Sequence, residues 1–273
     1  MQTYNSYFII NNIIKFNDIY DNIDFIEIIE REVMNGNKID EIIFGYYFNQ
    51  DISFLPEYIT KIEFGKNFNN RIDFLPKKLK KLKFDFWSNF NQNLDNLPSE
   101  LEELKLGVKF NHGLDNLPDG LINLEMGRGF NKPLDKLPKS LKHLSFSYGS
   151  HFNHSIDNLP DSLINLELGG EYNQYIKKFP NSLESLRILG KFNKELDNLP
   201  ESLILLQLGD HFNCMLNNLP NGLKYLDLGY SFNHPLDNLP ESLLELKIVN
   251  TYSNFRKINN PPPNVKIRNS YLP

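Results

Sequence analysis

The stretch FNHGLDNLPDGLINLEMG occupies residues 110–127, and FNKPLDKLPKSLKHLSF follows it closely at residues 130–146. Phe-Asn, Leu-Asp and Leu-Pro return at the same places in both stretches, 20 residues apart. A fixed period of this length indicates a repeat architecture in which each copy forms one structural unit.

The repeat runs through most of the chain, and its most regular mark is an asparagine that follows Phe, or Tyr in one copy. These asparagines are Asn49, Asn69, Asn91, Asn111, Asn131, Asn153, Asn173, Asn193, Asn213 and Asn233. Successive copies are 20 residues apart, except for two intervals of 22. Prolines from Pro56 to Pro240 keep the same spacing, so the pattern reads L-x-x-L-x-L-G-x-x-F-N-x-x-L-D-N-L-P-x-x.

Each copy predicts a short strand followed by tight bends. In LEELKL, Leu104 and Leu106 alternate with Glu103 and Lys105, which is the period-2 pattern of a strand with one buried face. A glycine such as Gly107 recurs after the strand, where a positive φ or a close backbone approach is expected. In DNLP, the aspartate is expected to accept hydrogen bonds from N–H groups ahead of it, and the proline excludes a helix interior.

The recurring asparagine needs its own explanation, because an inward amide is costly when it has no hydrogen-bond partner. Stacked coil above coil, the ten asparagines are predicted to point inward and to bond both the backbone of adjacent coils and each other. The Phe before each one is expected to join a parallel aromatic spine. A single coil cannot bury a core alone, so the copies are predicted to form one solenoid.

These residues carry a family resemblance. The L-x-x-L-x-L start, the asparagine and the later Leu-Pro resemble a leucine-rich repeat, and FGKNFNNRIDFLP at residues 64–76 is similar to the FNIP (FGxxFN) repeats of amoebal and giant-virus proteins. The resemblance implies a mainly β solenoid of about eleven coils of 20–22 residues, with a parallel concave sheet and a helix-poor convex side. The convex segment is too short for the helices of longer leucine-rich repeats, so we do not expect a strongly curved horseshoe.

The chain is expected to have three parts. Residues 1–38 lack the repeat and predict a small N-terminal α/β cap, residues 39–250 predict the solenoid, and residues 251–273 predict a degenerate C-terminal capping repeat. Both caps are expected because the open ends of a solenoid must be covered.

The N-terminal part predicts a hairpin around Asn11-Asn12 and a helix in DNIDFIEIIEREVMNG, capped by Asp21 or Asn22 and closed by Gly36. Proteins of the FNIP family often carry an F-box in this position, which implies a substrate adaptor of a ubiquitin ligase. This segment lacks the Leu-Pro opening and the aromatic ending of an F-box, so a divergent segment would have to fill that role.

Composition narrows the choice of partner and compartment. A net charge of −5 and a pI near 5.7 argue against a non-specific nucleic-acid binder. The lone cysteine, Cys214, cannot form an internal disulfide, which favours a reducing compartment. The apolar run near the N-terminus has no basic start and predicts neither a signal peptide nor a membrane span. We therefore expect an intracellular, cytoplasmic protein, placed in the host cytoplasm if it is viral, with no membrane partner.

The two 22-residue coils are the most individual features of the repeat. FDFWSNFN and FSYGSHFN each insert two residues after the strand and replace the usual glycine. They place Phe86, Trp87 and Tyr148 in bulges that are expected at the same corner. Aromatic side chains on such loops can anchor a protein interface, or they can fold over the spine and plug the bulge.

The outward strand positions are expected to form two columns. One reads Glu41, Lys61, Lys81, Glu103, Asn123, His143, Asn165, Ser185, Leu205, Tyr225, Glu245, and the other reads Ile43, Glu63, Lys83, Lys105, Glu125, Ser145, Glu167, Arg187, Gln207, Asp227, Lys247. Neither column is a basic stripe. Leu205 and Tyr225 form a small apolar patch beside Arg187 and Asp227, which is a candidate protein-binding spot on a face that can also be simply solvated.

No metal, cofactor or catalytic site is predicted. The aspartate column from Asp73 to Asp237 is interrupted by Lys177 and Asn217, and it lacks the glycine-rich loop of a calcium site. The histidines that follow Phe-Asn are too widely spaced to share a zinc ion. Glu125 and Glu167 share a strand column but are separated by the coil of Ser145, so paired-carboxylate hydrolysis is not expected.

The pattern favours a non-catalytic module that binds another protein through its rigid surface. The identity of that partner is not predicted. Two alternatives stay open, a self-associating structural protein that forms homodimers through a terminal coil or edge, and the ubiquitin-ligase substrate adaptor.

Overall fold

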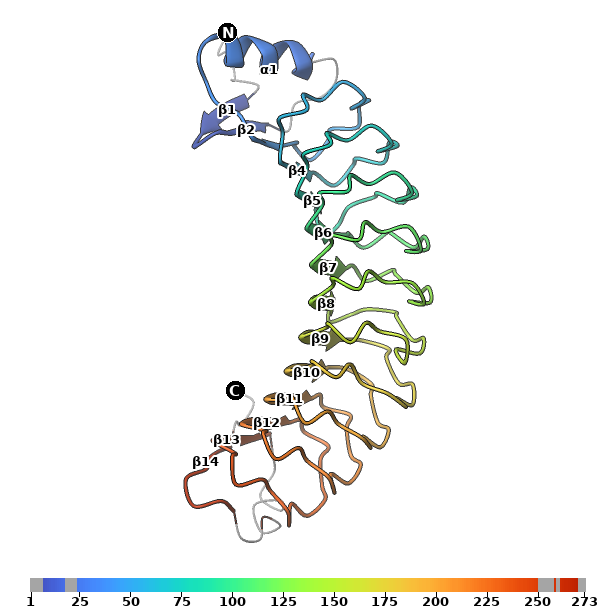
Figure 1. Cartoon of the computed structure of the whole chain (residues 1–273), viewed down its shortest axis with the longest axis vertical. Helices are drawn as coiled ribbons and strands as arrows, with labels where there is room; N and C mark the ends of the chain where they lie inside the picture. The colour runs from blue at the N-terminus through green and yellow to red at the C-terminus, as the bar shows by residue number, and fades with distance from the viewer. Residues whose placement is uncertain (1–6, 18–23, 250–257, 259–260, 270–273) are drawn as a thin grey trace. The chain divides into compact units, whose positions relative to one another are not determined.

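A computed structural model describes residues 7–17, 24–249, 258 and 261–269. The chain divides into two compact units, Met1–Phe130 (unit 1) and Asn131–Pro273 (unit 2). Each unit is a stack of coils that contribute one short strand each (Figure 1). The fold is mainly β, and the predicted leucine-rich-repeat solenoid with a parallel sheet is confirmed.

Unit 1 contains the strands β1–β7 and the helix α1. Their bounds are β1 Tyr7–Ile10, β2 Ile13–Phe16, α1 Phe25–Met34, β3 Glu41–Ile43, β4 Lys61–Phe64, β5 Lys81–Phe84, β6 Glu103–Lys105 and β7 Asn123–Met126. Unit 2 contains β8 His143–Phe146, β9 Asn165–Leu168, β10 Ser185–Ile188, β11 Leu205–Leu208, β12 Tyr225–Leu228, β13 Glu245–Ile248 and β14 Lys266–Asn269. Within each unit neighbouring strands pair in parallel and in chain order, except that β1 and β2 are antiparallel.

The strand register places equivalent residues of successive coils side by side. In unit 2, Ser185 pairs with Leu205, Leu205 with Tyr225, and Tyr225 with Glu245. The leucine between the two outward positions is buried in each of these strands, as at Leu206. The two columns read from the sequence therefore lie on one face of the sheet within each unit.

A stack of aromatic rings runs through the core of each unit. The rings before the recurring asparagines lie 5.9–6.3 Å apart from coil to coil, as in Phe110–Phe130 and Phe192–Phe212. In the first coils a second Phe from the strand joins the stack, so that Phe64 lies 3.8 Å from Phe68. Aromatic side chains bury large apolar areas, so this spine adds to the core that the buried leucines and isoleucines form in each coil.

The recurring glycine is explained by a close backbone approach and not by a positive φ. A Cβ at Gly65 would overlap the carbonyl group of Gly45, and one at Gly127 would overlap that of Gly107. The glycines with positive φ are Gly36, Gly170 and Gly190, outside this column. Adjacent coils therefore touch backbone to backbone at this corner.

The asparagines form hydrogen bonds between coils, but the prediction that they point inward is wrong. The Oδ1 atom of Asn153 accepts from the backbone N–H of Asn173 at 3.0 Å, and the same bond recurs seven more times at 2.8–3.1 Å. Asn173 is half-buried and the other nine asparagines are exposed. The aromatic residue before each asparagine packs in the ring stack, so the amide stays at the surface and bonds the next coil from outside.

A second row of bonds explains the Asp-Asn pair and corrects its expected role. The carboxylates of Asp73, Asp95 and Asp135 accept from the side-chain amide of the asparagine in the following coil, at 2.9–3.2 Å. These aspartates thus join coils, whereas hydrogen bonds within their own turn were expected. Serines add a third row, since Ser162 and Ser202 donate to leucine carbonyls of the preceding coil at 2.8 Å.

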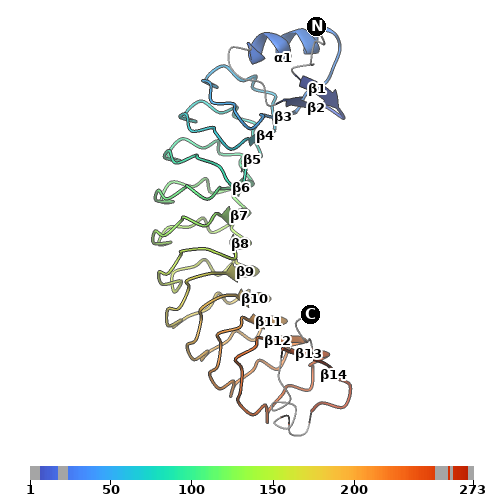
Figure 2. The same cartoon turned by 180° about the vertical axis from the view of Figure 1, so that it is seen from behind.

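The N-terminal elements cover the end of unit 1. The predicted hairpin is confirmed, with β1 and β2 joined by Asn11 and Asn12 at positive φ. The proposed helix caps Asp21 and Asn22 lie outside the described residues, and the side chain of Asp24 caps α1. Phe25 of α1 packs edge-on against the rings of the first coil, where α1 lies across the stack (Figure 2).

The C-terminal segment repeats half of a coil. Val265 N–H donates to the carbonyl of Pro262, as Leu243 N–H does to Pro240 in the preceding coil. The strand β14 then pairs in parallel with β13. These contacts place a proline turn and a strand, equivalent to half of a coil, at the end of unit 2.

Candidate functional site

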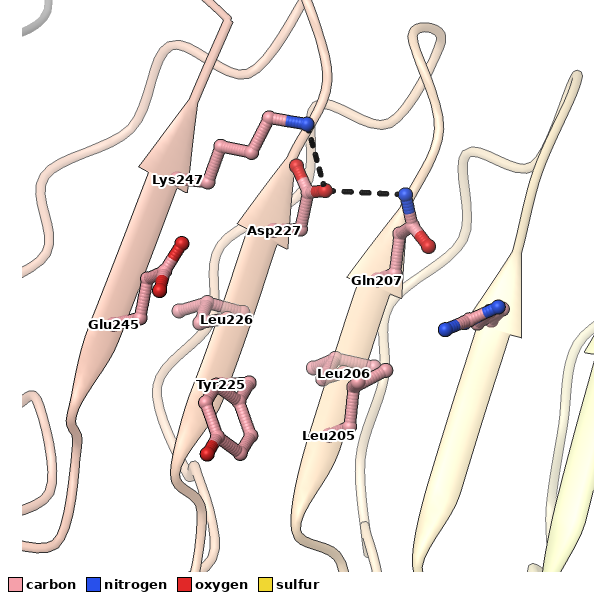
Figure 3. A pocket seen from close by; sticks show the side chains of 9 residues that line it. Leu205, Leu206, Gln207, Tyr225, Leu226, Asp227, Glu245 and Lys247 are labelled. Carbon is pink, nitrogen blue, oxygen red and sulfur yellow. Dashed lines mark hydrogen bonds and ion pairs between the residues drawn. The ribbon is translucent and has the colours of Figure 1, made fainter. Parts of the chain in front are cut away.

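The outward face of the sheet in unit 2 carries the predicted apolar patch. Leu205 of β11 and Tyr225 of β12 are cross-strand neighbours in a shallow hollow of about 210 Å³ (Figure 3). Arg187, Gln207, Asp227 and Lys247 also line it. The structure thus brings together the four residues predicted on this face, which are Leu205, Tyr225, Arg187 and Asp227. Tyr225 is 42 % exposed, and Leu205 is half-buried. We call the hollow lined by Arg187, Leu205, Gln207, Tyr225, Asp227 and Lys247 the sheet-face hollow.

The charged groups of the sheet-face hollow are already paired. The Oδ2 atom of Asp227 accepts from Gln207 Nε2 at 3.1 Å and lies 3.3 Å from Lys247 Nζ (Figure 3). On either side, Arg187 lies 3.8 Å from Glu167, and Arg268 lies 3.1 Å from Glu245. The hollow is therefore balanced in charge, and its apolar centre is the part that gains most when water is removed.

The same face in unit 1 has a different character. The carboxylate of Glu103 forms ion pairs with Lys81 Nζ at 2.7 Å and with Lys83 Nζ at 2.8 Å. Lys105 Nζ lies 2.8 Å from the carboxylate of Glu125. Partial burial alone would raise the pKa of Glu103, but the hydrogen bonds from Lys81 and Lys83 lower it overall. This part of the face is a network of ion pairs, which favours a solvated surface.

The two 22-residue coils expose the aromatic residues singled out in the sequence. Phe86 and Trp87 are 41 % and 60 % exposed in unit 1, and Tyr148 is 71 % exposed in unit 2. These side chains do not fold over the spine. Each insertion is instead filled by a serine that sequence reasoning missed, Ser88 or Ser150, which is fully buried and accepts from the Phe N–H two residues later at 3.1 Å.

The histidines and the cysteine have structural contacts. Nε2 of His112, His154 and His234 lies 2.9–3.1 Å from the carbonyl oxygen of the asparagine in the preceding coil. Burial raises the pKa of the Cys214 thiol, which lies 3.3 Å from Asn193 Oδ1. Within the described parts of the chain, no three His, Cys, Asp or Glu side chains gather as a metal site would require. No helix in the described parts of the chain is long enough and apolar enough to cross a membrane.

Coils of about twenty residues, each with one strand of a parallel sheet and a buried Phe spine, define a leucine-rich-repeat solenoid. Within that class, the model of the FNIP repeat matches residues 51–86, 110–149, 152–191 and 215–251, more than half of the chain. The chain belongs to the FNIP-repeat family.

Solved structures give the same class. The chain is similar to CroV588, described as a novel circular LRR protein structure, with a TM-score of 0.66 and 28 % identity, covering 96 % of this chain and 50 % of that one. Its fold is also similar to YopM from Yersinia enterocolitica WA-314, with a TM-score of 0.61 and 21 % identity, covering 84 % of this chain and 50 % of that one. The chain thus spans about half the length of each. No curated protein matched the sequence of this chain.

Proposed function

We propose that this chain is a non-catalytic protein-interaction module and that a partner protein binds at the sheet-face hollow of unit 2. The observation that carries the proposal is the pair Leu205 and Tyr225. They form an apolar centre on a sheet face whose other described positions are mostly polar or ion-paired. Leucine-rich-repeat solenoids typically serve as interaction modules, which agrees with this reading.

The energetics of the site suit recognition. The coils around the hollow are joined by the asparagine bonds and the ring stack, so the surface is ordered before a partner arrives. A preformed surface loses little conformational entropy on binding. A half-exposed Tyr surrounded by polar groups is the kind of residue that contributes most to an interface when water is excluded from it.

The proposal is tested by affinity purification with matched variants. Tagged wild-type protein, Tyr225→Ala, Leu205→Glu and the control Asn165→Ala are compared, since Asn165 lies in the same strand column outside the hollow. We expect a protein captured by the wild type and by Asn165→Ala but lost with the two hollow variants. Titration of that purified partner should show at least roughly ten-fold weaker binding to Tyr225→Ala. Equal capture by all four proteins would contradict the assignment of the site.

Self-association is the second candidate, and a specific feature favours it. The edge strand β1 has the sequence YFII, without charge or proline, and its Phe8 and Ile10 are 42 % and 58 % exposed. Hydrophobic edge strands readily pair with another chain. Light scattering across a range of protein concentrations separates the candidates, because dimers should form as concentration rises and should be lost in Ile10→Lys. A monomer at all concentrations would reject self-association.

A further inference from the structure

A second exposed surface lies at one corner of unit 1. It is formed by the residues that follow three successive strands, namely Tyr46, Tyr47, Lys66, Phe86 and Trp87, and we call it the aromatic corner. The four aromatic side chains are 38–60 % exposed. Sequence reasoning found Phe86 and Trp87 but missed the other three, because they occupy ordinary repeat positions.

The loop that presents Phe86 and Trp87 is tightly held. Asp85 N–H donates to the Phe64 carbonyl, and the Asp85 carboxylate accepts from Trp87 N–H at 2.7 Å. Ser88 N–H donates to the Asp85 carbonyl, and the buried Ser88 hydroxyl accepts from Phe90 N–H. The Phe86 carbonyl accepts from Val108 of the following coil at 2.9 Å. The two rings are thus displayed on a rigid support.

The rings form two edge-to-face pairs. Tyr46 and Tyr47 are 4.7 Å apart with an interplanar angle of 68°, and Phe86 and Trp87 are 4.9 Å apart at 88°. Lys66 belongs to the coil between them, and its Nζ donates to the Tyr46 hydroxyl at 2.7 Å. A hollow of about 310 Å³, lined in part by Tyr46, Lys66 and Asp85, opens beside the first pair.

The corner is basic although the whole chain has a net charge of −5. In the five coils of unit 1, the residues just after the strands include Lys66, Lys109 and Arg128 but a single carboxylate, Asp85. That carboxylate is engaged by its own loop. Lys15 and Glu63 add one charge of each sign at the neighbouring hollow.

The corresponding corner of unit 2 provides a natural comparison. Its 22-residue coil has the same buried serine, Ser150, but displays Tyr148 and Gly149 where unit 1 has Phe86 and Trp87. Its lysine, Lys191, is paired with Glu171 at 2.8 Å. Aromatic pairs together with an excess of cations are therefore specific to unit 1 among the described residues.

We propose that the aromatic corner is a docking site for an acidic segment of a partner protein, one that carries an apolar side chain between Asp or Glu residues. The apolar side chain would contact the edge-to-face rings, and the carboxylates would face Lys66, Lys109 and Arg128. Single-stranded nucleic acid is disfavoured, because the chain carries a net charge of −5 and in each pair the edge of one ring covers a face of the other. This site is separate from the sheet-face hollow and does not depend on it.

The test begins with selection of random dodecapeptides displayed on phage. The full chain is the target, and Trp87→Ala, which alters one exposed side chain, is used for counter-selection. We expect enriched peptides to combine Asp or Glu with Leu, Pro or an aromatic residue. Trp87 is the sole tryptophan of the chain, so its emission reports directly on binding of each synthesised peptide. Salt should weaken the binding.

Matched variants decide the outcome. Trp87→Ala and Lys109→Glu should weaken the peptide about 30-fold and ten-fold, measured by anisotropy of a labelled peptide, whereas Tyr148→Ala should leave it unchanged. Melting curves of the variants serve as the control for folding. Enrichment of Lys- and Arg-rich peptides, no enrichment over Trp87→Ala, or tighter binding of oligo(dT) than of any acidic peptide would overturn the proposal. Because Tyr225→Ala should retain the peptide, this site and the sheet-face hollow can fail independently.

Discussion

Replacing Asn153 with Ala tests whether the surface asparagines hold the coils together. In the native chain its Oδ1 accepts from Asn173 N–H at 3.0 Å, and the backbone of residue 153 is unchanged by the substitution. Asn153 is exposed, so water can take over part of the lost bond. The expected loss is therefore about 0.5–1.5 kcal/mol, the net value of an ordinary hydrogen bond, and not the larger penalty of a buried orphan group.

The measurement is urea unfolding followed by far-UV circular dichroism. Asn153→Asp is the matched control, because a carboxylate oxygen can still accept from Asn173 N–H and only the amide donor is lost. At a salt concentration that screens the new charge, the Asp variant should unfold close to the wild type while the Ala variant unfolds earlier. Adding Asn213→Ala, whose bond from Asn233 N–H lies three coils beyond the Asn153–Asn173 bond, should roughly double the loss.

Two results would refute this reasoning. If Asn153→Asp loses as much stability as Asn153→Ala, the amide donor and not the Oδ1 acceptor is the stabilising group. If neither variant changes the unfolding midpoint, the bonds between coils are replaced by water at no cost, and the recurrence of asparagine has another cause.

Three further predictions concern buried groups and ion pairs. Tyr172→Phe should raise stability by about 1–3 kcal/mol in the same urea assay, because the buried Tyr172 hydroxyl has no hydrogen-bond partner among the described residues; an unchanged midpoint would indicate a bound water. Ser88→Ala should cost about 1–3 kcal/mol by leaving Phe90 N–H without its acceptor, whereas Ser88→Thr should cost less if the extra methyl fits. The pKa of Glu103 is lowered in the folded state, so its stabilising contribution is present above the unfolded pKa and is lost as the pH falls through the lower folded value. Glu103→Gln should flatten that part of the stability–pH curve, and an identical curve would exclude the role.

The parts of the fold that repeat could be read from the sequence. Leu104 and Leu106 predicted a strand with one buried face, and residues 20 positions apart do pair in register. Repetition makes such predictions strong, because an error in one coil would reappear in all the others. The depth of the asparagines could not be read in the same way, since a regular polar residue fits an inward ladder or an outward one equally well.

The candidate sites were predicted less evenly. Leu205 and Tyr225 stood out because they break a polar column, and they share one hollow in the structure. Tyr46, Tyr47 and Lys66 were missed because their contacts join different coils, and a pattern averaged over all repeats hides such local clusters. The buried serines could have been found from the sequence, since both 22-residue coils have a serine two positions before the Phe of the Phe-Asn pair.

Within each coil, the positions that stabilise the fold differ from the exposed positions that are available for binding. The core leucines, the ring stack and the hydrogen-bond rows hold neighbouring coils together at positions that scarcely vary, whereas the outward strand positions and the corner loops are free to differ from coil to coil. Tyr225 and Trp87 belong to the second group, because both are exposed and neither occupies a hydrogen-bond row or the spine. Their replacement by Ala should therefore impair binding at unchanged unfolding midpoints, and a coupled loss of stability would show that recognition and support are not separate in this solenoid.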